Sequence, residues 1–331
     1  KDIGVDLERF ETAFDRSFFR KNGLGAVTYF NKEVFGEDKV VRHPYCNYPN
    51  YVEGLMPSQL THEEAAAQAP LSEKGREQLL RVLNGGLHAI DVPKAELRRY
   101  IRSHSYYDYL ENTLGVNDPG VMRMARHSGL DWASTGTDLM SIGTAKSCGA
   151  LGFAPVAVYD EDNPYVYHFP DGNAGVARAL VKKLIPEVAE GSNAEELVLA
   201  RLNYAELDKS SHAVRIRLNS TVVHVKHGAD PKSSSDVFVR YIHDNKSYQV
   251  NAKGVVMACY NVMIPHIVAG LPAKQASALK VQVKSPLQYT TVGLKSWRAM
   301  KELGIGLAMS PGNMHQAVLM DFPVSMGGYE Y

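Results

Sequence analysis

The spacing of apolar residues changes near residue 166, and this change constrains the fold more than any other feature of the sequence. Before it, apolar side chains recur every three or four residues in short segments, which is the spacing of one helix face. After it, several segments alternate apolar and polar residues, which is the spacing of strands with one buried face. The sequence therefore predicts a helical part followed by a part rich in strands, in an α/β or α+β architecture.

The helices expected in the first part have recognisable start signals. Asp6, Ser72 and Pro93 each precede an apolar run with helical spacing. Ser105-Tyr106-Tyr107-Asp108 has the form of a capping box, and Asp118-Pro119 places a capping residue before a proline at the first helical position. Several short helices in succession predict a helical subdomain.

The second part is expected to contain a turn, a helix and a series of strands. Asp171-Gly172-Asn173 has turn and cap chemistry and leads into an apolar helical run that Pro186 ends. Residues 254–258 are almost continuously apolar, which is typical of a strand buried on both faces of a sheet. The alternating segments before it are joined by polar loops, with Asp244-Asn245 at one turn, and predict an antiparallel meander. The strands predicted are 165–169, 214–225, 237–241, 248–252, 253–258, 287–294 and 315–320.

Length and charge exclude several classes of protein. A chain of 331 residues exceeds the roughly 150 that one domain usually takes, so about two domains are expected. Its 36 basic and 36 acidic residues balance, which disfavours nucleic acid as a partner. No apolar run approaches the roughly 18 residues of a membrane span. The chain begins at Lys1 without the pattern of a signal peptide, so we expect any targeting segment to lie outside it.

The common catalytic and metal-binding motifs are absent from the sequence. There is no GxxxxGK[ST], GxSxG, HExxH or GxGxxG, and the three cysteines form neither CxxC nor CxxCH. Gly23-Leu24-Gly25 is interpreted as a helix stop, and His43-Pro44-Tyr45-Cys46 as a structural or surface loop. His224 and His227 are three residues apart on a predicted strand, which places their rings on opposite faces. No metal site is predicted, and these patterns assign no catalytic residue.

Three runs of residues carry a resemblance to a known family. Residues 167–180 (YHFPDGNAGVARAL), 216–225 (IRLNSTVVHV) and 254–261 (GVVMACYN) resemble bacterial spermidine dehydrogenases, which belong to the flavin-containing amine oxidase superfamily. The resemblance extends in weaker form over most of the chain, including residues 105–110 and 284–289. It implies part of a Rossmann-like FAD domain (residues 166–260) with a β-meander, flanked by portions of a helical and antiparallel-sheet substrate domain (residues 1–165 and 261–331).

The same resemblance implies where cofactor and substrate bind. The glycine-rich turn that opens a helix borders the substrate cavity in the family, and the strand after it contacts the FAD adenine through a backbone valine, here Val222. The buried strand that ends in Ala258-Cys259 runs beside the dinucleotide half of FAD. The implied cofactor-binding residues are Thr221, Val222, Ala258 and Cys259, and the implied substrate-binding residues are His168, Asp171, Gly172, Asn173 and Gly175.

The activity implied is the FAD-dependent oxidation of a C–N bond in a polyamine such as spermidine, in the periplasm. FAD supplies the hydride acceptor, so the protein has to supply position and charge selection. Two groups of carboxylates could bind a cationic amine. One is Asp160-Glu161-Asp162, which could instead be a solvated loop, and the other is Asp171, which could instead be a helix cap. Because the family's GxGxxG and its C-terminal flavin segment are missing from this sequence, we expect this chain by itself to bind FAD weakly or not at all, and the parent chain to bind it tightly. Two alternative functions remain open: a flavoprotein that acts on another amine or an amino acid, and a non-catalytic scaffold. The presence of a non-covalent haem and the identity of the electron acceptor also remain open.

Overall fold

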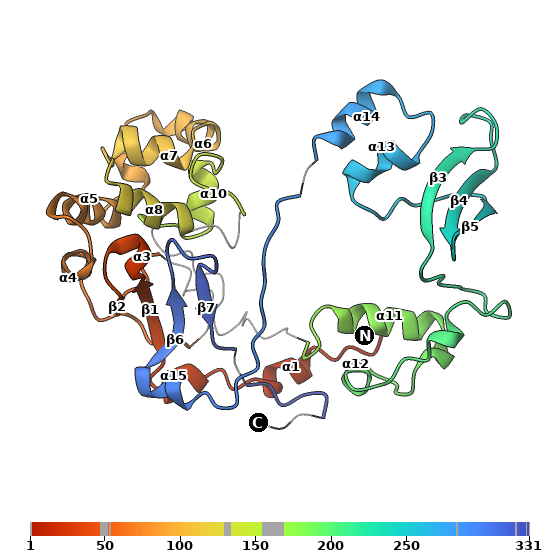
Figure 1. Cartoon of the computed structure of the whole chain (residues 1–331), viewed down its shortest axis with the longest axis horizontal. Coiled ribbons are helices and arrows are strands. Elements are labelled where there is room, and N and C mark those ends of the chain that lie inside the picture. The colour runs from red at the N-terminus through yellow and green to blue at the C-terminus, as the bar shows by residue number, and fades with distance from the viewer. Residues whose placement is uncertain are drawn as a thin grey trace. The chain divides into compact units, whose positions relative to one another are not determined.

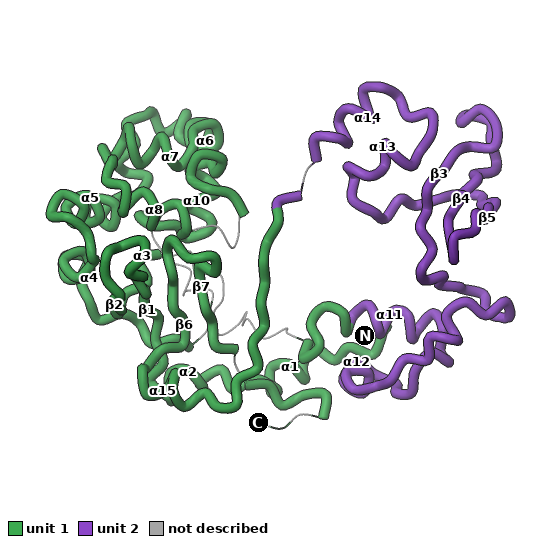
Figure 2. Tube along the Cα trace, viewed as in Figure 1, with its two compact units in different colours: residues 1–175, 286–331 green, residues 176–285 purple. Residues whose placement is uncertain are grey.

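The computed structural model describes residues 2–46, 52, 54–128, 134–153, 169–282, 284–321, 323–328 and 330. The chain forms two compact units, one from residues 1–175 and 286–331 and the other from residues 176–285 (Figure 1, Figure 2). With 37% helix and 15% strand, it has the mixed α/β composition that the sequence predicts. Each unit is described by itself below.

Unit 1 is built on a four-stranded sheet whose central pair comes from opposite ends of the sequence. The strand order is β2-β1-β6-β7. β1 and β6 are parallel, with Thr28 opposite Met309, while the two outer pairs are antiparallel. The sequence predicted β7 within 315–320 but missed the other three strands. Their bounds are β1 (Gly25–Phe30), β2 (Lys39–Val41), β6 (Ile305–Met309) and β7 (Ala317–Leu319).

The helices of unit 1 begin largely where the sequence predicts. The Ser72 side chain accepts the N–H of Gly75 at 3.0 Å, and the Asp118 side chain accepts those of Gly120 and Val121. Ser105 and Asp108 form the expected capping box. The helices are α1 (Glu8–Ala13), α2 (Phe18–Lys21), α3 (Lys32–Phe35), α4 (His62–Gln68), α5 (Glu73–Leu83), η2 (Leu87–Ala89), α6 (Lys94–Ser103), α7 (Tyr106–Asp108), η3 (Tyr109–Thr113), α8 (Pro119–His127), α10 (Ile142–Ser147) and α15 (Arg298–Leu303).

The first predicted helix is shorter than its apolar spacing indicates. The run after Asp6 divides into α1 and α2, because Phe14 has extended backbone angles (φ −102°, ψ 133°) and forms a bridge with Val324. The Phe14 side chain still packs with Phe10 in a small core that includes Met326. Phe10, Phe14 and Phe18 are therefore buried as expected without one continuous helix, whereas Leu7 is 59% exposed.

The main core of unit 1 lies between the sheet and the helices α4 to α10. Its fully buried members include Phe30 of β1, Leu79 of α5 and Ile142 of α10. Tyr106 and Tyr109 are also fully buried, and the Tyr109 ring stacks on Phe153. This core holds the strands of the sheet against the helical layer.

Unit 2 contains the predicted antiparallel meander. The three-stranded sheet has the order β3-β4-β5, and Asp244 and Asn245 both have positive φ (46° and 59°) at the turn between β4 and β5. This is the geometry of a tight hairpin turn. The elements are α11 (Ala174–Leu184), which crosses the border between the units, η4 (Pro186–Val188), α12 (Ala194–Leu197), η5 (Tyr204–Glu206), β3 (Thr221–His227), β4 (Val237–His243), β5 (Lys246–Ala252), η6 (Asn261–Met263), α13 (Ile264–Ile267) and α14 (Ala273–Lys280).

The unit borders at 175/176 and 285/286 differ from the domain borders expected at 165/166 and 260/261. Residues 261–285 remain with the meander because the segment after α13 pairs with β3. Val268 forms a parallel bridge with Val225, and the N–H of Ala269 donates to the Val225 carbonyl at 2.9 Å.

Two strand predictions are wrong, and a third is right only in its second half. Residues 254–258 and 287–294 are irregular, with Val256 89% and Tyr289 87% exposed, because in the described part of the chain neither segment has a hydrogen-bonded neighbour strand. Residues 214–220 precede β3 rather than belonging to it. There Arg215 and Arg217 both bind Asp208, and the N–H of Ile216 donates to the Leu207 carbonyl at 2.7 Å rather than to a neighbouring strand. Of the strand predicted at 165–169, residues 165–168 lie outside the described residues.

Candidate functional site

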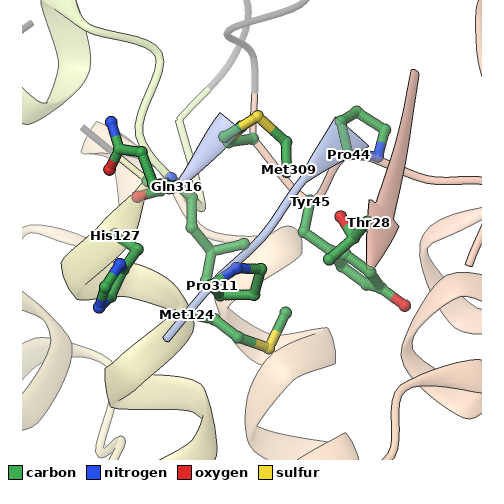
Figure 3. Close-up of a pocket in the computed structure, with 11 residues that line it drawn as sticks. Thr28, Pro44, Tyr45, Met124, His127, Met309, Pro311 and Gln316 are labelled. Carbon is green, nitrogen blue, oxygen red and sulfur yellow. The ribbon is translucent and has the colours of Figure 1, made fainter. Parts of the chain in front are cut away.

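A recess in unit 1 lies beside the carboxyl ends of the parallel strands β1 and β6. Ligands of open α/β sheets commonly bind at this edge, because the chain leaves the strands there and can diverge. We call it the β1–β6 recess; it is partly open to solvent, and its cavity volume of about 20 Å³ has room for about one water molecule (Figure 3). It is lined by Thr28, Pro44, Tyr45, Cys46, Met124, His127, Ser128, Leu151, Met309, Pro311 and Gln316.

One wall of the recess is held by hydrogen bonds around His43. The Thr28 hydroxyl donates to the His43 carbonyl at 2.8 Å, and the N–H of Tyr45 donates to Nδ1 of His43 at 3.0 Å. Burial, with a further contribution from nearby His62, lowers the pKa of His43 to about 4. Tyr45 has φ +56°, a backbone conformation that non-glycine residues rarely adopt and that is enriched at functional sites.

The run His43-Pro44-Tyr45-Cys46 is therefore structural, which is one of the two roles that the sequence predicts for it. Tyr45 and Cys46 are buried, and the Tyr45 hydroxyl donates to the Ala65 carbonyl in the middle of α4. Sequence reasoning missed that this loop also lines a recess. The recess combines residues from β1, α8 and the β6–β7 hairpin, and no local pattern connects those segments.

The opposite wall carries two polar side chains with unsatisfied atoms. His127 ends α8, and Gln316 precedes β7; Figure 3 shows both across from Thr28 and Tyr45, with the His127 ring and the Gln316 amide pointing away from them. Nδ1 of His127 and Oε1 of Gln316 are buried and have no hydrogen-bond partner in the described part of the structure. Burial, and then the charges of Arg126 and Arg123, lower the pKa of His127, so its imidazole is neutral near neutral pH.

The described lining of the recess mixes polar and apolar side chains. It contains an imidazole, a thiol, three hydroxyls and an amide, and no carboxylate. Among the described residues, no group of three or more His, Cys, Asp or Glu side chains is arranged to hold a metal ion.

The predicted substrate-binding residues other than His168 lie together in one turn. Gly172 has φ +70°, and its N–H donates to the Phe169 carbonyl at 2.8 Å. Asn173 directly precedes α11, and a Cβ added at Gly175 would lie 2.5 Å from Oδ1 of Asp171. The Asp171 carboxylate therefore covers the first turn of α11. His168 lies outside the described residues.

The predicted cofactor-binding residues occupy two segments of unit 2. Thr221 and Val222 begin β3, an edge strand, and Val222 is 37% exposed. Ala258 and Cys259 lie in the irregular segment that was expected to be a buried strand, and the Cys259 thiol is exposed. The cofactor-binding and substrate-binding groups belong to different units.

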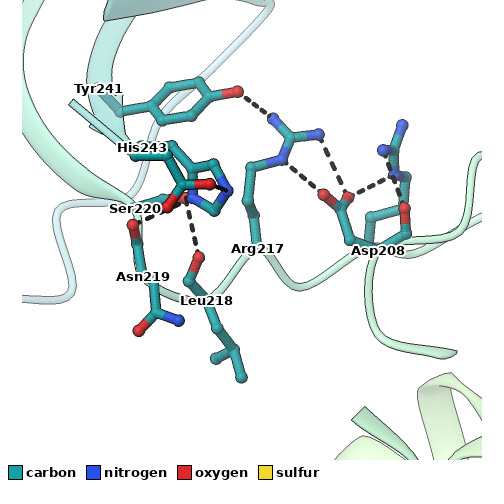
Figure 4. Close-up of polar contacts among 9 residues, drawn as sticks. Asp208, Arg217, Leu218, Asn219, Ser220, Tyr241 and His243 are labelled. Atoms are coloured by element: carbon teal, nitrogen blue, oxygen red, sulfur yellow. Dashed lines mark hydrogen bonds and ion pairs between the residues drawn. The ribbon is translucent and has the colours of Figure 1, made fainter. Parts of the chain in front are cut away.

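A cluster that sequence reasoning missed supports the start of β3 (Figure 4). The Asp208 carboxylate accepts hydrogen bonds from Nε of Arg215 and Nε of Arg217, each at 2.7 Å, and Arg217 also donates to the Tyr241 hydroxyl at 2.7 Å. The bonds from Arg217 are the largest cause that lowers the pKa of Asp208. Ser220 lies 3.2 Å from Nδ1 of His243 on β4. The only sequence signal was two arginines two residues apart.

Comparison with known proteins adds no relative, since no protein-family model and no curated protein matches the chain. In the described part of the chain, no helix combines the length and the apolar character needed to cross a membrane.

Proposed function

We propose that this chain is part of an FAD-dependent oxidoreductase that oxidises a C–N bond of a polyamine such as spermidine. The structural observation that carries the proposal is the open edge of β3 at Val222. The three residue runs that resemble spermidine dehydrogenases, together with α11 and the meander that follow the first run, support it. A Rossmann-like FAD domain, a non-covalent haem and a periplasmic location belong to the same proposal.

The geometry of β3 suits a backbone contact with a flat ring. In the described structure, Val222 pairs with Tyr241 on one side, and the other side of the strand is bridged only further along, at Val225. The pairing shifts register between Val222 and His224. Such irregularities bend a strand and are common beside active sites. The backbone of Val222 is thus accessible to an adenine.

The other implied FAD contacts fit less well. Ala258 and Cys259 are on an irregular segment, and the chain has no GxGxxG turn to seat a pyrophosphate at a helix N-terminus. The residues present therefore fit the adenine end of FAD alone. Bound FAD would accept the hydride equivalent removed from the carbon beside the amine nitrogen. The chain's own residues would position the cofactor and select the charge of the substrate.

Charge selection is assigned to Asp171. Its carboxylate lies against the first turn of α11, where the helix dipole is positive and would repel an ammonium group. A carboxylate at this position offsets that field and offers an acceptor to a polyamine. Gly172 and Gly175 keep the turn free of side chains that would block the approach.

Substitution of Val222 tests the FAD site. Val222→Pro removes one N–H from the edge strand, whereas Val250→Pro makes the same change on β5, the opposite edge strand. Equilibrium dialysis with FAD is expected to show at least tenfold weaker binding for Val222→Pro than for Val250→Pro, with a comparable loss of stability in both. Equal FAD binding by Val222→Pro and the unaltered protein would contradict the placement of the adenine.

Substitution of Asp171 tests the substrate site. Asp171→Asn keeps a side chain of the same shape but removes the charge. In the FAD-bearing parent protein, kcat/KM for spermidine should fall by several-fold to roughly a hundredfold, and kcat/KM for a monoamine should fall less. A lower melting temperature with unchanged spermidine kinetics would show that Asp171 is only a helix cap. Absence of flavin bleaching by any amine would reject the proposed reaction.

A further inference from the structure

We propose that the outer face of α6 is a docking surface for an acidic helix of a partner protein, one that carries Asp or Glu at every fourth residue. Four exposed cationic side chains form this face, which we call the α6 stripe: Lys94, Arg98, Arg99 and Arg102. The inference concerns unit 1 alone and does not depend on FAD or on amine oxidation.

The α6 stripe concentrates positive charge in a chain whose charges balance. With about 3.6 residues per turn, its four cations fall within a sector of roughly 140° around the helix, which they share with Ala95 alone. Glu96, the one acidic residue of α6, lies outside this sector, roughly 60° beyond Arg99. The whole chain has 36 basic and 36 acidic residues, so the excess of positive charge is local.

The α6 stripe has no acidic partner among the residues that the structure describes. The ion pairs there join other side chains, and none includes a residue of the stripe. The four positive charges therefore face solvent and are available to an anionic partner.

The stability of α6 does not explain this pattern. Lys94 and Arg102 each lie four residues from Arg98, and like charges at that spacing repel each other and destabilise a helix. Lys94 is also the first residue of the helix, where the helix dipole is positive and disfavours a cation. A negatively charged partner would offset both effects.

The stripe is held on a fixed support. Leu97, Tyr100 and Ile101, on the inner side of α6, pack against the main core of unit 1. At the end of the helix the Tyr100 ring stacks on His104, with 3.8 Å between ring centroids, and the His104 carbonyl accepts the N–H of Ile142 at 3.1 Å. Because α6 is already ordered, binding does not have to order it, which favours association.

Spacing and chemistry favour carboxylates on a helix as the partner. Lys94, Arg98 and Arg102 recur about 6 Å apart along the axis, and acidic side chains at every fourth position of another helix have the same repeat. Arginine also pairs with a carboxylate through two parallel hydrogen bonds.

Two other anionic partners fit less well. A membrane-surface helix inserts its apolar side into lipid, whereas the apolar side of α6 is packed against the core. Nucleic acid is attracted by a broad positive field, which a chain with balanced charge does not have.

The test uses two labelled, alanine-based helical peptides of about 20 residues. One has glutamate at every fourth position and the other has glutamine there; both residues favour helices, so the peptides differ mainly in charge. Fluorescence anisotropy at about 20 mM salt is expected to show about tenfold or more tighter binding of the glutamate peptide, as several exposed ion pairs together would give. This binding should weaken several-fold at about 200 mM salt.

A double variant locates the binding surface. Arg98→Gln with Arg102→Gln should weaken binding of the glutamate peptide by about threefold or more. Its melting temperature should not fall, because the substitutions remove repulsion between like charges. The matched control is Arg20→Gln with Arg298→Gln, which makes the same change in net charge at exposed arginines of α2 and α15 and should keep full binding.

The proposal is overturned if the two peptides bind alike, if both double variants weaken binding equally, or if the stripe variant melts several degrees lower, which would make these arginines part of the fold. Tighter binding of a DNA duplex, or of vesicles of equimolar phosphatidylcholine and phosphatidylserine, than of the glutamate peptide would also overturn it. The comparison of the two peptides uses the unaltered protein, so it decides the question even if a variant fails to fold.

Discussion

At the scale of single residues, buried His43 makes unit 1 sensitive to acid. Burial lowers its pKa from 6.5 to about 4, and its Nδ1 accepts the N–H of Tyr45, which requires the neutral ring. In the unfolded chain His43 takes up a proton near pH 6.5, before the folded protein does. Its contribution to the free energy of unfolding is therefore complete above pH 6.5, declines by about 3 kcal/mol as pH falls to 4, and is constant below.

Urea unfolding at a series of pH values measures this effect. His43→Asn should flatten the decline between pH 6.5 and 4, because the titrating ring is gone. His88→Asn, which removes an exposed histidine of the same unit, should keep the decline. An unchanged slope in His43→Asn would show that other groups cause the acid sensitivity.

A second residue-scale prediction concerns the buried hydroxyl of Tyr109. This oxygen accepts the N–H of Gly86 at 2.7 Å and donates to the Gly86 carbonyl at 3.1 Å, so one hydroxyl satisfies both backbone groups. Tyr109→Phe should lower the free energy of unfolding by about 1–3 kcal/mol, because both groups lose their partner. Tyr107→Phe, at a position 38% exposed, should change it by less than about 0.5 kcal/mol. Equal losses in the two variants would refute this role of Tyr109.

At the scale of elements, Gln78 joins α5 to the start of α8. Its Oε1 accepts the N–H groups of Asn117 and Asp118, each at 2.8 Å, and its Nε2 donates to Oδ1 of Asn117 at 2.9 Å. Gln78→Met keeps the length of the side chain but leaves two N–H groups without an acceptor. Urea or thermal unfolding should show a loss of about 2–4 kcal/mol. Glu77→Met, at the exposed neighbouring position, should lose less than about 0.5 kcal/mol, and a similar loss there would point to helix propensity instead.

At the scale of the whole molecule, the two units are expected to unfold in separate transitions. Gln78 lies in unit 1, and the Arg217 cluster lies entirely in unit 2. In differential scanning calorimetry, Gln78→Met should lower the melting temperature of unit 1 alone. Arg217→Ala should lower the melting temperature of unit 2 by a few degrees, since a partly exposed ion pair contributes up to about 1 kcal/mol to the free energy of unfolding.

Arg240→Ala is the control for Arg217→Ala. Arg240 is also in unit 2 and is exposed, and it contacts Gln249 rather than an acidic side chain. This variant should change the melting temperature of neither unit measurably. A single transition that shifts with every variant would show that the units unfold together.

The sequence by itself determined the features that depend on neighbouring residues. The caps at Ser72, Ser105 and Asp118, the turn at Asp244-Asn245 and the tight turn before α11 are all as expected. Each relies on hydrogen bonds or backbone angles within a few residues, which a local pattern records. The predicted substrate-binding residues Asp171 to Gly175 lie together for the same reason.

Only the tertiary structure decided which strands form and what they enclose. β1 pairs with β6 although about 280 residues separate them along the sequence, and no local pattern identifies such a partner. Residues 254–258 have the composition of a buried strand but are irregular, because a strand needs hydrogen-bonded neighbours as well as apolar side chains. His127 and Gln316 are joined in one recess by the same long-range pairing, since β6 brings the β6–β7 hairpin to the end of β1.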